Sequence, residues 1–377
     1  MIRVMIVDDS PLVRKIAGDI LAGEPDIEVV ATAATAEFAL NKLDREAPDV
    51  VTMDIEMPGI GGVEAIRRIM ARKPTPVIVL SSHALRGADF TLQALEAGAV
   101  DFVLKPTASL SGGLNQVARE LKEKVRNAAQ MPSFRRVPVP PTSDGARTGS
   151  KAGQFTFSSS PASDSDERLS GRSLNRRQGS GLIDLVAIGT STGGPVALKT
   201  VLEGLPGDFP VPIVVVQHMP PVFTKAFADR LNACSELSVK EAEEGDPLLP
   251  GTALIAPGDY HITVVRAFPQ PRITLSQSDP VSGHRPSVDV LMHSVASEYG
   301  SSAVGVIMTG MGKDGAAGIK ELHNKGALII AQDKESSVIF GMNREVIVNG
   351  DADAIAPVDR IAQTLQELVR RHERVER

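Results

Sequence analysis

Cysteine and the large aromatic residues are almost missing from this sequence. Its 377 residues include one cysteine, Cys234, no tryptophan and two tyrosines. A single cysteine forms neither an intramolecular disulfide nor a CxxC metal site, which excludes a secreted disulfide scaffold. The scarcity of aromatic rings argues against a stacking platform for single-stranded nucleic acid.

Long apolar runs and a positive net charge are absent as well. No run approaches the roughly 18 residues of a membrane-spanning helix, so we expect no membrane insertion. The formal net charge of −6 argues against nucleic acid as a partner. The N-terminus enters a strand-like run at once and lacks the shape of a signal peptide. Together these features predict a soluble, cytoplasmic protein.

Composition divides the chain into three parts. Residues 1–125 and 182–377 alternate short Val- and Ile-rich runs with segments of helical spacing, a pattern typical of doubly wound parallel sheets. Between them, 24 of the 51 residues from 130 to 180 are Ser, Pro, Gly or Thr. Such a composition cannot bury enough apolar surface to offset chain entropy. We therefore predict two α/β domains joined by a disordered linker over residues 126–181.

The stretch 251–277 departs from the strand–helix alternation. It holds three short apolar runs, Ala253–Ala256, Ile262–Val265 and Ile273–Leu275, separated by turns rich in Pro, Gly and Asp. This pattern predicts an antiparallel insertion or edge in the second domain.

Polar residues follow the predicted strands of the first domain. Asp8, Asp9, Asp54, Ser81 and Lys105 each stand at or directly after a strand end. In an open parallel sheet these ends meet at one edge, where ligands bind. Converging carboxylates repel one another unless a cation intervenes, and an all-oxygen cluster suits Mg²⁺. A carboxylate nucleophile at such a site can form an aspartyl-phosphate.

Each of these residues alone has a structural explanation, because acids at strand ends often cap helices. Taken in order, they resemble the receiver domain of a two-component response regulator. The residues that carry the resemblance are Asp8-Asp9, the string Met-Asp-Ile-Glu-Met-Pro-Gly at 53–59, Ser81 and Lys105-Pro106.

This resemblance assigns roles to particular residues. It implies that Asp54 accepts phosphate from a chemotaxis histidine kinase. It further implies that Mg²⁺ is held by Asp8, Asp9, Asp54 and the backbone of Glu56, and that Ser81, Phe102 and Lys105 are switch positions.

A second constellation lies in residues 182–377. Ser191 stands in the string Gly-Thr-Ser-Thr-Gly-Gly-Pro at 189–195, which follows a predicted strand, opens a helix and matches G-x-S-x-G. A serine hydroxyl needs a base. His218 ends the next buried strand and is the best of the seven histidines. Asp314 follows a later strand in a Gly-rich loop and fits the role of the acid that orients the base.

Other interpretations of these residues exist. The Gly-rich turn at 189–194 could cradle a phosphate, as in a dinucleotide fold. That alternative expects an acid at the end of the next strand, where Gln217 and His218 stand instead. His218 could also be a satisfied histidine at a strand end, and Asp314 could simply cap a helix.

The order Ser, His, Asp differs from that of α/β-hydrolases. Residues 183–371 resemble instead the catalytic domain of the chemotaxis protein-glutamate methylesterases, the CheB family. The resemblance rests on four strings in the family's order, at 188–194, 216–220, 283–289 and 308–315. It implies a Rossmann-like fold, and hydrolysis of glutamate γ-methyl esters and deamidation of certain glutamines on methyl-accepting chemotaxis receptors. It assigns an oxyanion role to the backbone N–H near Met311 and requires no cofactor for the esterase chemistry.

The family resemblance also implies regulation: the unphosphorylated receiver packs over the esterase site, and phosphorylation at Asp54 favours an open form. The sequence leaves open whether His284 and Arg285 line the site or the domain interface. A transcription factor is disfavoured, because residues 181–377 carry seven more acidic than basic residues. A catalytically inactive docking module remains the alternative to an enzyme.

Overall fold

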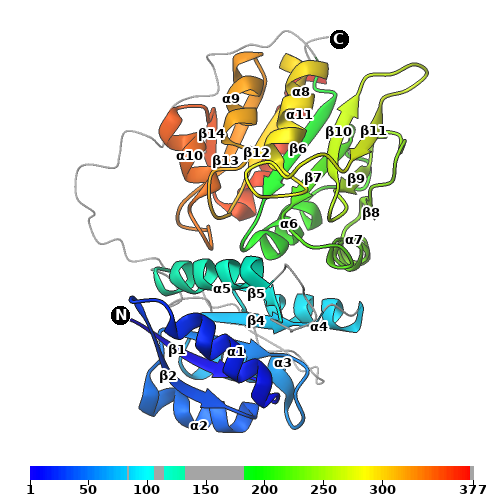
Figure 1. Cartoon of the computed structure of the whole chain (residues 1–377). Helices are drawn as coiled ribbons and strands as arrows, with labels where there is room; N and C mark the ends of the chain where they lie inside the picture. Colours follow the sequence, from blue (N-terminus) through cyan, green and yellow to red (C-terminus); the bar gives the residue numbers. More distant parts are fainter. Residues whose placement is uncertain (83–84, 106–113, 132–181, 374–377) are drawn as a thin grey trace, which may run out of the picture.

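The structure is a computed structural model that describes residues 1–82, 85–105, 114–131 and 182–373. These residues form two α/β domains (Figure 1). Most of the predicted linker, residues 132–181, lies outside the described residues, and so does Pro106.

The first domain is a five-stranded sheet with helices on both faces. Its elements are β1 (Ile2–Val7), α1 (Pro11–Ala22), β2 (Ile27–Ala33), α2 (Ala36–Glu46), β3 (Val50–Asp54), α3 (Gly61–Arg72), β4 (Val77–Ser81), α4 (Leu85–Glu96), β5 (Asp101–Leu104) and α5 (Leu114–Ala129). All its strand pairs are parallel, in the order β2-β1-β3-β4-β5. This is the flavodoxin-like order, which confirms the predicted fold class.

Burial explains the sequence pattern of these elements. Strands β3 and β4 are buried at every residue, so they read as continuous apolar runs. Helix α1 starts where Ser10 accepts a hydrogen bond from the Val13 N–H and Pro11 takes the first helical turn. Helix α5 runs to Ala129, past residue 125, where the sequence places the end of the domain. The boundary itself stays a prediction.

The second domain is a seven-stranded parallel sheet. Its elements are β6 (Leu185–Thr190), α6 (Gly194–Glu203), β7 (Ile213–Gln217), α7 (Phe223–Cys234), β8 (Ser238–Glu241), β9 (Thr252–Ile255), β10 (His261–Val265), β11 (Arg272–Ser276), α8 (Val288–Glu298), β12 (Ala303–Ile307), α9 (Ala316–Asn324), β13 (Leu328–Gln332), α10 (Met342–Asn349), β14 (Ala354–Ala356) and α11 (Val358–Glu373). The strand order is β14-β13-β12-β6-β7-β9-β8. Strands β12, β6 and β7 therefore lie side by side at its centre.

One part of the predicted antiparallel insertion is wrong. Strands β10 and β11 do form an antiparallel pair outside the main sheet. The run Ala253–Ala256, however, supplies β9, which pairs in parallel with both β7 and β8. The sequence does not reveal which strands this run pairs with, because parallel strands pair through long-range contacts that local residue spacing does not encode.

The first domain lies against the second through α4, β5 and α5 (Figure 1). At their contact, the rings of Phe102 in β5 and Phe223 in α7 stack with centroids 4.7 Å apart and planes 13° from parallel. The guanidinium of Arg230 forms an ion pair with Glu96, and Lys199 Nζ lies 3.4 Å from the same carboxylate. One buried apolar cluster runs through both domains. The first domain therefore covers part of the second domain in this conformation.

Among the described residues, no helix combines the length and the apolar composition that crossing a membrane requires.

Candidate active site

Three adjacent strands of the second domain bring the predicted serine, histidine and aspartate to one edge. Ser191 follows β6, His218 follows β7 and Asp314 lies in the loop after β12. Because β12, β6 and β7 are neighbours and parallel, their carboxyl ends share one side of the sheet. Ser191 and His218 both line a cleft of about 390 Å³ at this edge.

The Ser191 turn is held by backbone geometry. The Ser191 N–H donates to the Thr309 carbonyl at 3.0 Å, and the Gln217 amide donates to the Ser191 carbonyl at 3.0 Å. Gly193 has a φ of +78°, and a Cβ there would lie 2.4 Å from the Cβ of Val338. Only glycine fits this turn into helix α6. Because Gln217 is 2% exposed beneath the turn, it is not accessible to a ribose, which disfavours the dinucleotide alternative.

His218 is fixed by Asp314 through one ring nitrogen. Its Nε2 lies 2.7 Å from Asp314 Oδ2, so Nε2 carries the proton and donates to the carboxylate. Its Nδ1 is buried and has no hydrogen-bond partner in the described part of the chain. Ser191 Oγ likewise makes no hydrogen bond within these residues. The free lone pair on Nδ1 is therefore the basic position of this imidazole.

Asp314 is held as a carboxylate by the start of helix α8. Ser287 Oγ donates to its Oδ1 at 2.8 Å, and the N–H groups of Val288 and Asp289 donate at 2.8 and 3.2 Å. Burial by itself would raise the pKa of Asp314. The hydrogen bonds from His218, Val288 and Ser287 outweigh burial and hold that pKa well below its usual range. The Asp314 side chain thus orients His218 and does not cap the helix that follows it.

Two residues of the string at 283–289 reach this site without a role assigned from the sequence. Ser287 caps α8 and binds Asp314, and the spacing of a serine directly before a helix is the signal that could have found it. The His284 ring stacks on the His218 ring with centroids 3.8 Å apart and planes 7° from parallel. His284 and Arg285 line the cleft, which residues of the first domain also line, so they lie at the candidate site and at the domain contact alike. No sequence signal indicates the stack.

The backbone N–H of Met311 stays the predicted oxyanion donor. Met311 lines the cleft with Ser191, and its N–H donates no hydrogen bond within the described residues. A free amide beside a nucleophile suits a developing oxyanion.

Residues of the first domain complete the wall of the cleft. Asp101 and Phe102 of β5, and Glu120 and Lys124 of α5, line it opposite the second domain. The Thr192 hydroxyl, next to the candidate nucleophile, donates to Asp101 Oδ2. In this conformation the first domain therefore lies directly beside Ser191.

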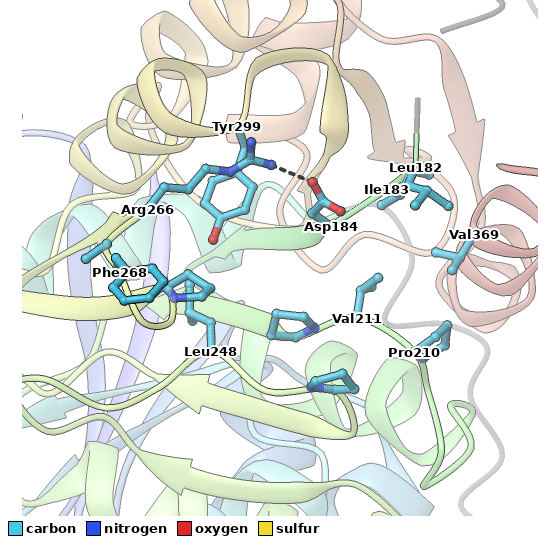
Figure 2. A pocket seen from close by; sticks show the side chains of 14 residues that line it. Leu182, Ile183, Asp184, Pro210, Val211, Leu248, Arg266, Phe268, Tyr299 and Val369 are labelled. Carbon is cyan, nitrogen blue, oxygen red and sulfur yellow. Dashed lines mark hydrogen bonds and ion pairs between the residues drawn. The ribbon is translucent and has the colours of Figure 1, made fainter. Parts of the chain in front are cut away.

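A larger cavity, of about 760 Å³, lies at the opposite edge of the second domain's sheet, before the strands begin (Figure 2). Its lining is mostly apolar, and its charged pair, Arg266 Nη2 and Asp184 Oδ2, is already joined at 2.5 Å. The lining holds no serine, cysteine or histidine. The candidate catalytic residues Ser191 and His218 lie in the smaller cleft.

The receiver's acidic residues gather as the sequence predicts. Ligand oxygens of Asp8, Asp9 and Asp54 lie within 4.8 Å of one another. Burial raises the pKa of Asp8, and the neighbouring charge of Asp54 raises it further. Lys105 Nζ lies 2.7 Å from Asp54 Oδ2 and 3.3 Å from Asp8 Oδ2. Three clustered carboxylates, two of them fully buried, fit Mg²⁺, which prefers such oxygens.

The remaining switch and metal predictions have different surroundings. Ser81 is buried, and its hydroxyl accepts a hydrogen bond from Thr91 Oγ1 at 2.7 Å. Phe102 is 5% exposed at the domain contact. The Glu56 N–H donates to Asp54 Oδ1 at 2.9 Å. The roles of these three residues stay predictions.

Comparison with known proteins decides the family. Residues 186–365 match the model of the CheB methylesterase family, and residues 4–111 match that of the response regulator receiver domain. A Chromobacterium violaceum protein named protein-glutamate methylesterase/protein-glutamine glutaminase 2 is 42% identical over 366 residues, 97% of this chain and 99% of that protein. The chain belongs to the CheB methylesterase family.

Other relatives of this family resemble the chain over the same length. A protein-glutamate methylesterase/protein-glutamine glutaminase of Thermotoga maritima is 42% identical over 369 residues, covering 98% of this chain and 99% of the relative. The crystal structure of the Thermotoga maritima CheB methylesterase catalytic domain aligns with 49% of this chain and 98% of its own at 47% identity, with a TM-score of 0.49.

Proposed function

We propose that this CheB family member hydrolyses γ-methyl esters of glutamate side chains on methyl-accepting chemotaxis receptors, and deamidates certain glutamines there. The observation that carries the proposal is that His218, paired with the buried Asp314, lines one cleft with Ser191 and has its basic nitrogen unoccupied. The names of full-length relatives at 42% identity support the substrate class.

The first half of the reaction forms an acyl-enzyme. Ser191 Oγ attacks the ester carbonyl while His218 Nδ1 takes its proton. The Met311 N–H stabilises the oxyanion, and Asp314 stabilises the imidazolium through Nε2. The C–O bond to the methoxy group then breaks, and the proton on Nδ1 goes to the leaving oxygen to give methanol. With a glutamine substrate the leaving group is ammonia.

The second half regenerates the serine. His218 Nδ1 removes a proton from water, which attacks the acyl carbon and displaces Ser191 Oγ. The serine regains the proton and a glutamate carboxylate is released. These steps use only side chains and backbone amides of the chain.

Phosphorylation of the receiver controls access in this proposal. Asp54 accepts a phosphoryl group from a histidine kinase, and Lys105 Nζ contacts the carboxylate that reacts. Mg²⁺ held by Asp8, Asp9 and Asp54 would neutralise charge on the phosphoryl group. The contacts of Asp101, Phe102 and Glu96 with the second domain favour the closed form. Phosphorylation must therefore favour an open form by several kcal/mol to change the population from mostly closed to mostly open.

The test measures methanol release from receptor membranes carrying methyl-labelled glutamates, with and without a small-molecule phosphodonor. We expect release by the wild-type protein, stimulation by the phosphodonor, and no measurable release by a folded Ser191→Ala variant. Turnover by Ser191→Ala close to that of the wild type would overturn the serine mechanism. No release by the wild-type protein would favour the docking module.

A further inference from the structure

The orientation of the His218 imidazole depends on contacts at the edge of the ring and on its face. The hydrogen bond to Asp314 fixes the position of Nε2, yet the ring can still tilt about that contact. The ring of His284 lies against one face, with centroids 3.8 Å apart and planes 7° from parallel. A parallel ring at this distance restricts the tilt of His218 and excludes water from that face.

His284 is itself held on a rigid loop. Its N–H donates to the Val281 carbonyl at 2.9 Å, and the Val281 N–H donates back to the His284 carbonyl at 3.1 Å. On its other side, the Arg285 guanidinium binds Asp259 Oδ1 at 2.5 and 3.0 Å. The same guanidinium donates to the carbonyls of Gln277 and Ser278 at 3.0 Å each. Arg285 thus anchors the loop, and its neighbour His284 carries the ring to the cleft.

The charge state of His284 suits this contact. Burial, followed by the nearby charge of His218, lowers the pKa of His284 to about 4. Asp314 acts in the opposite direction, whereas Lys124 and Arg119 of α5 reinforce the lowering. The ring that faces His218 at neutral pH is therefore neutral. A neutral aromatic ring stabilises a positive charge on His218, whereas a charged His284 would repel it.

We propose that His284 is a positioning residue: its ring, stacked on His218, restricts the tilt of the imidazole and so keeps Nδ1 in place as the base for Ser191. The inference rests on the proposed esterase function. The positioning role requires the flat ring of His284 but neither ring nitrogen. A residue that binds substrate through a hydrogen bond needs a ring nitrogen, and this difference distinguishes the two roles.

Two substitutions distinguish these roles in the full-length protein. His284→Ala removes the ring, and His284→Phe keeps a flat ring without nitrogens. An aromatic stack corresponds to roughly a threefold to tenfold change in rate. We expect kcat of His284→Ala to fall by about that factor with little change in KM, and His284→Phe to recover most of the loss. His293→Ala, which removes a histidine from the exposed side of α8, is the matched control.

A spectroscopic measurement on the wild-type protein keeps the inference testable if His284→Ala fails to fold. Nitrogen-15 NMR of ring-labelled histidine is expected to show His218 protonated on Nε2 and unprotonated on Nδ1 at neutral pH. In a folded His284→Ala, we expect the same tautomer with broader His218 ring signals, because the tilt of the ring is no longer restricted.

The outcomes separate the two proposals. No methanol release by the wild-type protein overturns the esterase function. The positioning role alone is overturned if the wild type releases methanol, Ser191→Ala does not, and His284→Ala has the kcat of the wild type. A His284→Phe variant as slow as His284→Ala overturns it too, because a nitrogen of His284 is then required. A wild-type His218 protonated on Nδ1 contradicts the geometry on which the role depends.

Discussion

Replacing His284 by phenylalanine should change how the stability of the second domain depends on pH. The pKa of His284 is lowered from 6.5 to about 4, chiefly by burial. As the pH falls below 6.5, the unfolded chain takes up a proton at this side chain that the folded chain does not bind until about pH 4. The unfolded state then binds more protons, so stability decreases as the pH falls.

The size of the effect follows from the same values. Where the unfolded chain holds one more proton than the folded chain, the free energy of unfolding falls by about 1.4 kcal/mol for each pH unit. This holds over roughly one and a half units below 6.5, so His284 lowers the free energy of unfolding by about 2 kcal/mol between pH 7 and pH 5. Phenylalanine does not titrate, so His284→Phe should lack this loss.

The assay is urea unfolding at pH 7 and pH 5, followed by tyrosine fluorescence. The chain has no tryptophan, and its two tyrosines, Tyr260 and Tyr299, both lie in the second domain, so the signal reports that domain alone. Contributions of groups far from the mutated site cancel in the difference between the two proteins, whereas that of His218, which stacks on His284, does not. Equal losses of stability in both proteins would show that folded His284 is charged at pH 5, and would refute the reasoning.

Three further predictions concern the receiver and the triad. Glu96→Gln removes the charge that Arg230 and Lys199 share, so the closed form should lose about 1 kcal/mol and methanol release without phosphodonor should rise about fivefold. A basal rate equal to that of the wild type would show that this ion-pair cluster does not hold the domains closed. Asp54→Asn should take up no labelled phosphate from a phosphodonor and lose its stimulation of methanol release; retained labelling would place the phosphorylated residue elsewhere. Asp314→Asn should lower kcat by roughly 10⁴-fold, as loss of the orienting acid does in the serine protease template, and a loss below tenfold would contradict its role.

The sequence by itself determined the two α/β folds and the edge at which each site forms. Buried parallel strands are recognisable in the sequence as apolar runs. The side chains that follow such strands meet at the carboxyl edge of the sheet, independently of the rest of the fold. Asp8, Asp9 and Asp54 therefore gather as expected, and His218 reaches Asp314 from a distant part of the chain.

Only the tertiary structure decided how these groups face one another. The parallel pairing of β9, the orientation of the His218 ring and the stack of His284 depend on contacts between segments far apart in sequence. The wall that Asp101 and Phe102 add to the cleft depends on how the two domains pack. Local spacing specifies which residues share a strand end or a helix face. Ring orientation, strand pairing and domain packing arise from long-range complementarity, which one sequence does not display.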